Sequence, residues 1–257
     1  MSRGPDRLLG MRRHWRLLIG IIVAVLLLAA TAGYVWLSDL ADPMPETEAA
    51  MVSSETVSVE TEPWLTFSPL DPATTGFIFY PGGRVSAEAY APPVRELAEA
   101  GYLGVITPMP FGLAVLDASA ADAVMAAHPE VERWIIGGHS LGGAMAAQYA
   151  AGQADIEGLA LWAAYPPDGT DLSGGDVLVA SISASEDGLA TPDEIEASAA
   201  QLPGDTTFVE IAGGNHAQFG WYGAQDGDGE ATISRESQQE QVVGATLALI
   251  EAVAARE

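Results

Sequence analysis

The sequence predicts an α/β protein with a mostly parallel central sheet flanked by helices, preceded by one N-terminal transmembrane helix. Three observations lead to this prediction. Short apolar segments typical of buried strands alternate with helical segments from residue 76 to residue 254. One strand is joined to the next helix by a glycine-rich corner around Ser140. Residues 17–37 contain no charged side chain.

Only short connections separate the predicted strands and helices. Residues 56–67 favour β structure but contain Pro63, which suits one or two edge strands. Thr191 and Glu194 form a capping box with Pro192 at the first helical position, so a helix begins there. The other predicted strands are 76–80, 102–107, 133–137, 156–162, 177–182 and 206–211, and the other predicted helices are 86–100, 116–127, 141–151 and 234–254.

Residues 17–37 are predicted to form a transmembrane anchor. A helix rising about 1.5 Å per residue spans roughly 31 Å over this range, which matches the hydrocarbon core of a bilayer. Residues 1–16 form a short basic segment with five arginines and one aspartate. By the positive-inside rule this segment is cytoplasmic and the rest of the chain is extracytoplasmic. The predicted location is therefore the cell membrane, with a single pass.

A cleavable signal peptide is the alternative interpretation of the N-terminus. Ala30, Thr31 and Ala32 resemble a small-residue cleavage site after a basic region. The apolar core would be longer than is usual for a signal peptide, which favours the uncleaved anchor. Cleavage would make the domain a secreted protein, so both interpretations export it.

The rest of the chain is predicted to be an acidic linker, 38–55, followed by one domain, 56–257. The chain has no cysteine, so an exported domain of this sequence uses no disulfide. After residue 37 there are five arginines against 34 acidic residues, a formal charge of −29. Such a surface repels polyanions, so no nucleic-acid partner is expected.

Ser140 is the candidate nucleophile. Residues 138–142 read Gly-His-Ser-Leu-Gly, a G-x-S-x-G pentapeptide between a predicted strand and a predicted helix. A serine at such a turn projects its hydroxyl outward, and the glycines permit the tight backbone and the close approach of strand and helix. A chain this rich in glycine can contain the pattern by chance, so the surrounding strand and helix carry the argument.

His216 and Asp187 are the candidate base and acid. A serine hydroxyl needs a base, and the base needs a carboxylate that orients it. His216 lies in a glycine-rich loop directly after the last predicted strand, where ligand-facing groups of a parallel sheet are found. Asp187 follows the strand before it, and its short side chain beside Gly188 suits a fixed turn better than Glu186 does. The other three histidines are His14, His128 and His139.

The order Ser140, Asp187, His216 is that of the α/β-hydrolase triad. Residues 76–257 resemble an α/β-hydrolase of the compact lidless group that includes dienelactone-hydrolase-like and carboxylesterase-like enzymes. The resembling segments are 80–83, 138–142, 185–188 and 214–216. Two departures are Pro81-Gly82 where the family usually has His-Gly, and a serine where dienelactone hydrolases have a cysteine.

The resemblance implies an oxyanion hole made by the backbone N–H groups of Leu141 and Gly83, with Arg84 as a neighbour that could meet a substrate carboxylate. The 46 residues between Ser140 and Asp187 leave no room for a lid domain. Trp221 and Tyr222 are expected either to wall the cleft or to serve as packing aromatics. Residues 226–230 have carboxylates at calcium-loop intervals, but an acidic surface loop is the favoured interpretation.

The sequence therefore predicts a serine hydrolase that cleaves a carboxylic ester or related acyl bond of a small substrate through an acyl-enzyme. This chemistry requires no cofactor and no metal. The alternatives are an inactive binding or scaffold domain at the cell envelope and a peptidase or lactonase with the same triad. The expected partners are a small acyl substrate and, through residues 17–37, the membrane.

Overall fold

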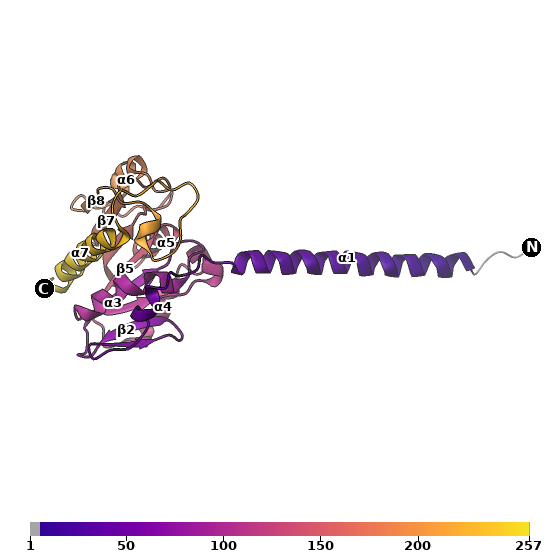
Figure 1. The fold of residues 1–257 in the computed structure, drawn as a ribbon, viewed down its shortest axis with the longest axis horizontal. Helices are drawn as coiled ribbons and strands as arrows, with labels where there is room; N and C mark the ends of the chain where they lie inside the picture. The colour runs from indigo at the N-terminus through magenta and orange to yellow at the C-terminus, as the bar shows by residue number, and fades with distance from the viewer. Residues whose placement is uncertain (1–5, 257) are drawn as a thin grey trace, which may run out of the picture. The chain divides into compact units, whose positions relative to one another are not determined.

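The computed structural model describes residues 6–256, so residues 1–5 of the expected basic segment lie outside the described residues. The chain divides into two compact units, Met1–Asp39 and Leu40–Glu257. Figure 1 shows the first as a single helix and the second as a sheet with helices packed on it.

The first unit contains the helix α1, Asp6–Ser38, which is longer than the predicted span of 17–37. Its stretch Leu18–Val35 has a mean hydropathy of 2.5 and none of it is buried within the protein. The helix is long and apolar enough to cross a membrane. One such helix near an N-terminus fits a membrane anchor and a signal sequence equally well.

The second unit is built on one eight-stranded sheet in the order β1-β2-β4-β3-β5-β6-β7-β8. β1 forms one edge of the sheet. β1 pairs antiparallel with β2, β2 pairs antiparallel with β4, and all pairs from β4 to β8 are parallel. The strands are β1 Val57–Glu60, β2 Leu65–Pro69, β3 Thr75–Tyr80, β4 Leu103–Ile106, β5 Arg133–His139, β6 Ile156–Trp162, β7 Leu178–Ala184 and β8 Thr207–Ile211.

Helices cover both faces of the sheet, because the central strands are apolar on both sides. Phe77 and Phe79 of β3 pack in a core with α3 and α7, whereas Ile78 and Tyr80 pack in a second core with α4 and α5. The helices are α2 Thr47–Ala50, η1 Ala87–Tyr90, α3 Ala91–Glu99, η2 Pro110–Gly112, η3 Ala114–Leu116, α4 Ala120–Ala127, α5 Leu141–Ala150, α6 Pro192–Ser198, η4 Ala199–Gln201, η5 Ala217–Phe219 and α7 Arg235–Ala254. The predicted fold class is confirmed.

Two local expectations were wrong. The helix expected over 116–127 begins as α4 only at Ala120, because the chain makes the separate 3-10 turn η3 before it. The expected linker 38–55 is largely part of the second unit. From Ala41 its backbone bonds to neighbouring loops, with the Ala41 N–H 2.7 Å from the Arg84 carbonyl oxygen and the Met44 N–H 2.8 Å from that of Trp221.

Candidate active site

The parallel strands bring the three predicted triad residues to the same end of the sheet, beyond the carboxyl ends of the strands. Ser140 follows the carboxyl end of β5, Asp187 lies in the loop after β7, and His216 lies in the loop after β8. The loops after parallel strands open onto one edge, and ligands of α/β sheets bind there. The fold therefore places these residues where the sequence predicted a site.

Ser140 occupies a strained turn between β5 and α5. Its φ of 52° and ψ of −122° are unusual for a residue other than glycine. The backbone N–H of Ser140 donates to the Trp162 carbonyl, 3.0 Å away, which ties the turn to β6. A Cβ on Gly142 would lie 2.1 Å from the Tyr80 carbonyl oxygen, so only glycine allows α5 to approach β3 this closely.

His216 and Asp187 form a buried hydrogen-bonded pair. His216 Nδ1 lies 2.8 Å from Asp187 Oδ2, and the two side chains are 1% and 0% exposed. The other oxygen of Asp187 accepts from the N–H groups of Leu189 and Ala190, each at 2.8 Å. Because an ionised carboxylate only accepts, Nδ1 carries the proton and Nε2 is left as the basic nitrogen. Asp187, rather than Glu186, is the acid that reaches His216.

The hydrogen bond from Ser140 to His216 is not formed in this structure. Nε2 of His216 is buried and has no hydrogen-bond partner among the described residues. Such contacts are often long in unliganded enzymes and tighten when substrate binds. The structure thus brings Asp187 to His216 and leaves Nε2 available to a hydroxyl or a substrate.

Asp228 holds the loop that carries His216, a role that the sequence did not reveal. Its carboxylate accepts from the N–H groups of His216 at 3.0 Å, Ala217 at 2.8 Å and Gly229 at 2.8 Å. The N–H of Gly188, next to Asp187, lies 3.4 Å from the same carboxylate. Within the described part of the chain no group of acidic or histidine side chains is arranged to hold a metal ion. Through these hydrogen bonds Asp228 ties the loop of His216 to the loop of Asp187.

Two backbone N–H groups next to Ser140 lack partners among the described residues, those of Gly83 and Leu141. On either side of Gly83 the N–H groups are occupied, with Gly82 donating to the Tyr90 hydroxyl at 3.1 Å and Arg84 to the Gly112 carbonyl at 2.7 Å. A Cβ on Gly83 would lie 3.3 Å from Leu141 Cδ2, so the two residues are neighbours. The family resemblance implied the same two N–H groups as oxyanion donors.

His139 joins the Gly82 loop to the ring of His216. The Tyr90 hydroxyl is hydrogen-bonded to His139 Nδ1 at 2.9 Å, and the His139 and His216 ring centroids are 4.4 Å apart. Tyr90 is fully buried and His139 is 1% exposed. Burial, and next the nearby His216, lower the pKa of His139 well below its usual value. His139 is therefore neutral at physiological pH.

Comparison with known proteins identifies the family of the chain. Residues 76–240 match the model of the alpha/beta hydrolase family, which is more than half of the chain. The chain belongs to the alpha/beta hydrolase family. It is accordingly a hydrolase. No curated protein sequence matches it.

Solved structures similar to this hydrolase include a thermophilic esterase, Est2, from the Planctomycetes species Thermogutta terrifontis. That likeness has a TM-score of 0.54 at 14% identity and covers 83% of this chain and 96% of the esterase. A predicted CIB-like hydrolase from Thermoplasma acidophilum gives a TM-score of 0.54 at 14% identity, covering 76% of this chain and 99% of that protein. At these identities the likeness extends to the fold.

A small cleft of this hydrolase opens beside Ser140. It has a volume of about 290 Å³ and is lined by Ser140, Leu141, Ala144, Ala163, Ala164, Tyr165, Pro167, Leu189 and Ala190. The lining is mostly apolar side chains. Trp221 and Tyr222 are buried, and the Tyr222 ring packs 6.3 Å from that of His139. Neither lines the cleft, so both are packing aromatics.

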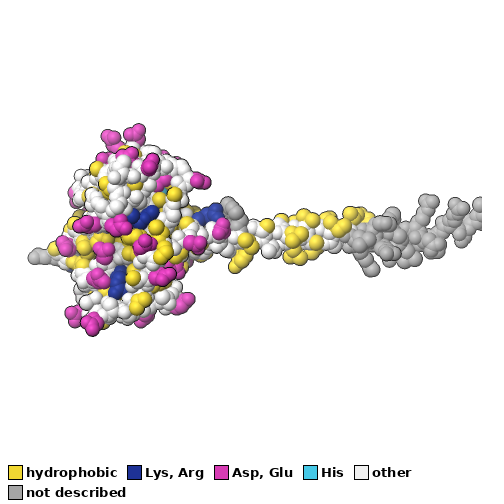
Figure 2. Space-filling model, in the orientation of Figure 1, with side chains coloured by type: hydrophobic (Ala, Val, Ile, Leu, Met, Phe, Trp, Pro, Cys, Tyr) yellow, Lys and Arg dark blue, Asp and Glu magenta, His cyan; other side chains and the backbone are white. Residues whose placement is uncertain are grey.

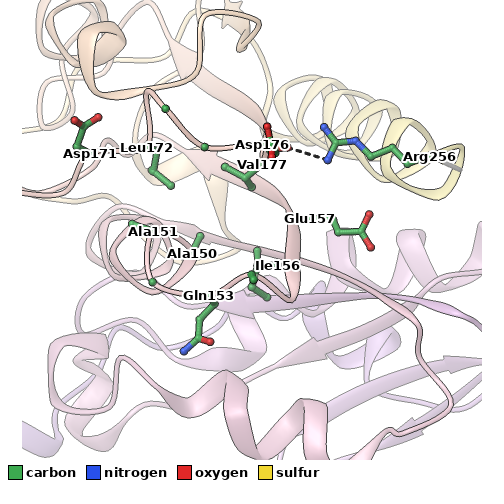
Figure 3. Close-up of a pocket in the computed structure, with 14 residues that line it drawn as sticks. Ala150, Ala151, Gln153, Ile156, Glu157, Asp171, Leu172, Asp176, Val177 and Arg256 are labelled. Atoms are coloured by element: carbon green, nitrogen blue, oxygen red, sulfur yellow. Dashed lines mark hydrogen bonds between the residues drawn. The ribbon is translucent and has the colours of Figure 1, made fainter.

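A larger cavity of about 660 Å³ lies at the opposite end of the sheet, at the amino ends of the strands (Figure 3). Ile156 begins β6, Val177 directly precedes β7, and both line it together with Arg256 near the C-terminus. The Arg256 guanidinium donates to the Asp176 carbonyl at 2.9 Å, as the dashed line in Figure 3 shows. Because these residues lie at the amino ends of the strands, the cavity is at the opposite end of the sheet from Ser140.

Proposed function

We propose that the protein is a serine hydrolase that cleaves a carboxylic ester or related acyl bond of a small substrate through an acyl-enzyme. The observation that carries the proposal is the buried pair of His216 and Asp187, fixed at 2.8 Å, at the same sheet edge as Ser140 on its strained turn. A buried imidazole with one nitrogen held by a carboxylate and the other unpaired is the arrangement that a general base requires.

The proposed reaction proceeds in two halves. Ser140 Oγ attacks the carbonyl carbon as its proton passes to His216 Nε2, and the carbonyl oxygen becomes an oxyanion facing the N–H groups of Gly83 and Leu141. The intermediate then collapses, and the leaving group departs with the proton from Nε2. Water attacks the acyl-Ser140 ester with His216 again taking the proton, and release of the acid restores the serine.

The size and lining of the cleft support a small acyl group. A volume of about 290 Å³ is at the lower end for small-molecule sites. The residues between Ser140 and Asp187 form α5, β6, β7 and their connections, so no lid domain covers the cleft. Two similar solved structures are those of an esterase and of a hydrolase, which supports the same reaction class.

We further propose that α1 anchors the protein in the cell membrane with residues 1–16 in the cytoplasm. The apolar stretch Leu18–Val35 and the arginines before it support this orientation. The hydrolase domain would then be extracytoplasmic. Figure 2 shows carboxylates spread over the visible face of the domain.

Labelling of the full chain by a fluorophosphonate probe tests the catalytic proposal. Ser140→Ala is expected to abolish both labelling and hydrolysis of short p-nitrophenyl esters. Ser173→Ala, in an exposed loop where the hydroxyl bonds only to Asp171, is the matched control and should label normally. Undiminished labelling of Ser140→Ala would refute the assignment. A panel of esters, thioesters, lactones and amides would then define the acyl bond.

A further inference from the structure

The residues 110–116 expose an unusual share of the domain's apolar surface. The side chains of Phe111, Val115 and Leu116 are 39%, 57% and 56% exposed. The other large apolar side chains exposed in the described part of the second unit are Val52, Leu70 and Phe208, which lie apart in the sequence. We call residues 110–116 the apolar loop. A soluble domain rarely concentrates such side chains without a contact that covers them.

The apolar loop is held firmly beside the proposed oxyanion loop. The carbonyl of Gly112 accepts the N–H of Arg84 at 2.7 Å, next to Gly83. Ala114 is fully buried in the core that also contains Met145 of α5. The exposed side chains are therefore displayed by a fixed backbone at the same end of the sheet as Ser140.

The chain enters the second unit at the apolar loop. A Cβ on Gly112 would lie 2.7 Å from Leu40 Cδ2, so the Leu40 side chain packs directly over this loop. Leu40 is the first residue of the unit, and the next residue, Ala41, donates to the Arg84 carbonyl at 2.7 Å. The point of entry is thus fixed to the domain and cannot drift away from the apolar loop.

Chain length limits the distance from this point to the apolar helix. The apolar stretch of α1 ends at Val35 and the helix ends at Ser38, two residues before Leu40. Three residues of helix and two extended residues span at most about 11 Å. The headgroup layer on each side of a bilayer is roughly 5–7 Å thick. Whatever the direction of the helix, Leu40 stays close to the headgroups if α1 is inserted.

We propose that the apolar loop docks into the outer surface of the bilayer that holds α1. This proposal rests on the membrane anchor proposed above. The occupant of the patch is the lipid interface, because the tether keeps the patch within reach of it. The domain carries 34 acidic residues and five arginines after residue 37, so anionic lipids do not attract it and the contact is apolar. Docking places the mouth of the Ser140 cleft at the lipid–water interface.

The absence of cysteine from the chain allows a direct test. Single variants V115C and L116C are labelled with the fluorophore NBD in the full chain and reconstituted into phosphatidylcholine vesicles that contain a doxyl-labelled lipid. The expected result is a blue-shifted emission and at least twofold quenching by the doxyl lipid at both positions. The controls are L70C, directly after β2, and F208C, in the edge strand β8; these positions are 64% and 47% exposed, and their emission should not change.

Two further measurements separate the ways in which the proposal can fail. Extraction of the vesicles with carbonate reports whether α1 is inserted, and fluorophosphonate labelling reports whether each variant is folded and has a working Ser140. Release by carbonate would overturn the anchor and the docking together while leaving the hydrolase assignment intact. Carbonate-resistant, probe-reactive protein whose labels at residues 115 and 116 behave like the controls would overturn the docking alone.

Discussion

Tyr90→Phe tests the hydrogen-bond bridge beneath the site. The change removes one oxygen and leaves the ring in its packing against Phe79, 4.9 Å away. It leaves the N–H of Gly82 and Nδ1 of His139 without partners in a fully buried environment. An unpaired buried polar group costs about 1–3 kcal/mol, so we expect a loss of about 2–4 kcal/mol of unfolding free energy. For a domain of this size that is roughly 5–15 °C in Tm.

The catalytic effect of Tyr90→Phe should appear mainly in kcat. Gly82 precedes Gly83, so a shifted loop misplaces a proposed oxyanion donor, and such displacements lower rates about 10- to 100-fold. The assays are thermal unfolding followed by circular dichroism and hydrolysis of a short p-nitrophenyl ester.

Tyr149→Phe is the control for Tyr90→Phe, because its hydroxyl donates only to Asp122 on the outside of the domain. If Tyr90→Phe lowers Tm no more than Tyr149→Phe does, and leaves kcat unchanged, the bridge has no importance for the site.

Three other predictions concern the same group of residues. Asp187→Asn should lower kcat about 10⁴-fold, because an amide can donate to Nδ1 and favours the wrong tautomer of His216; near-normal turnover would exclude the pair from catalysis. Asp228→Asn should lower the unfolding free energy by about 2–4 kcal/mol, seen as a lower Tm, because the carboxylate accepts three close N–H groups. It should also lower kcat. If neither Tm nor kcat changes, these hydrogen bonds are dispensable. The pKa of His139 is lowered on folding, so the unfolded chain binds the extra proton. Unfolding free energy measured in urea should therefore fall below about pH 6.5, by at most about 1.4 kcal/mol per pH unit from this group, and His139→Gln should remove that part of the slope.

The elements that the sequence predicts best are those with local causes. β6 has the predicted bounds Ile156–Trp162, where an apolar segment interrupted only by Glu157 follows the polar Asp155. Thr191 caps α6. Its side chain accepts from the Glu194 N–H, and the Glu194 side chain accepts from the Thr191 N–H. The strained Ser140 turn follows from the glycines on either side of it. In each case the residues that decide the structure are close together in the chain.

The features that could not be predicted depend on partners far away in the sequence. Residues 40–52 have no apolar period, and backbone hydrogen bonds to Arg84 and Trp221 fix the start of this stretch instead. Asp228 looks like one more acidic residue of an exposed loop until the fold brings it to the His216 backbone. Tyr90 and His139 are 49 residues apart, so no local sequence pattern predicts the hydrogen bond between them. Only the assembled sheet edge brings these groups together.

The charge of His139, directly before Ser140, affects the proton transfer to His216 in the proposed mechanism. In the proposed mechanism His216 becomes positively charged each time that it takes a proton. Two unit charges 4.4 Å apart, the separation of the two imidazole rings, repel by about 4 kcal/mol at an effective dielectric constant of 20. A charged His139 would therefore oppose proton transfer, whereas the buried, neutral ring that the structure shows does not. The same burial that holds the Ser140 turn in place thus keeps the neighbourhood of the base free of a competing positive charge.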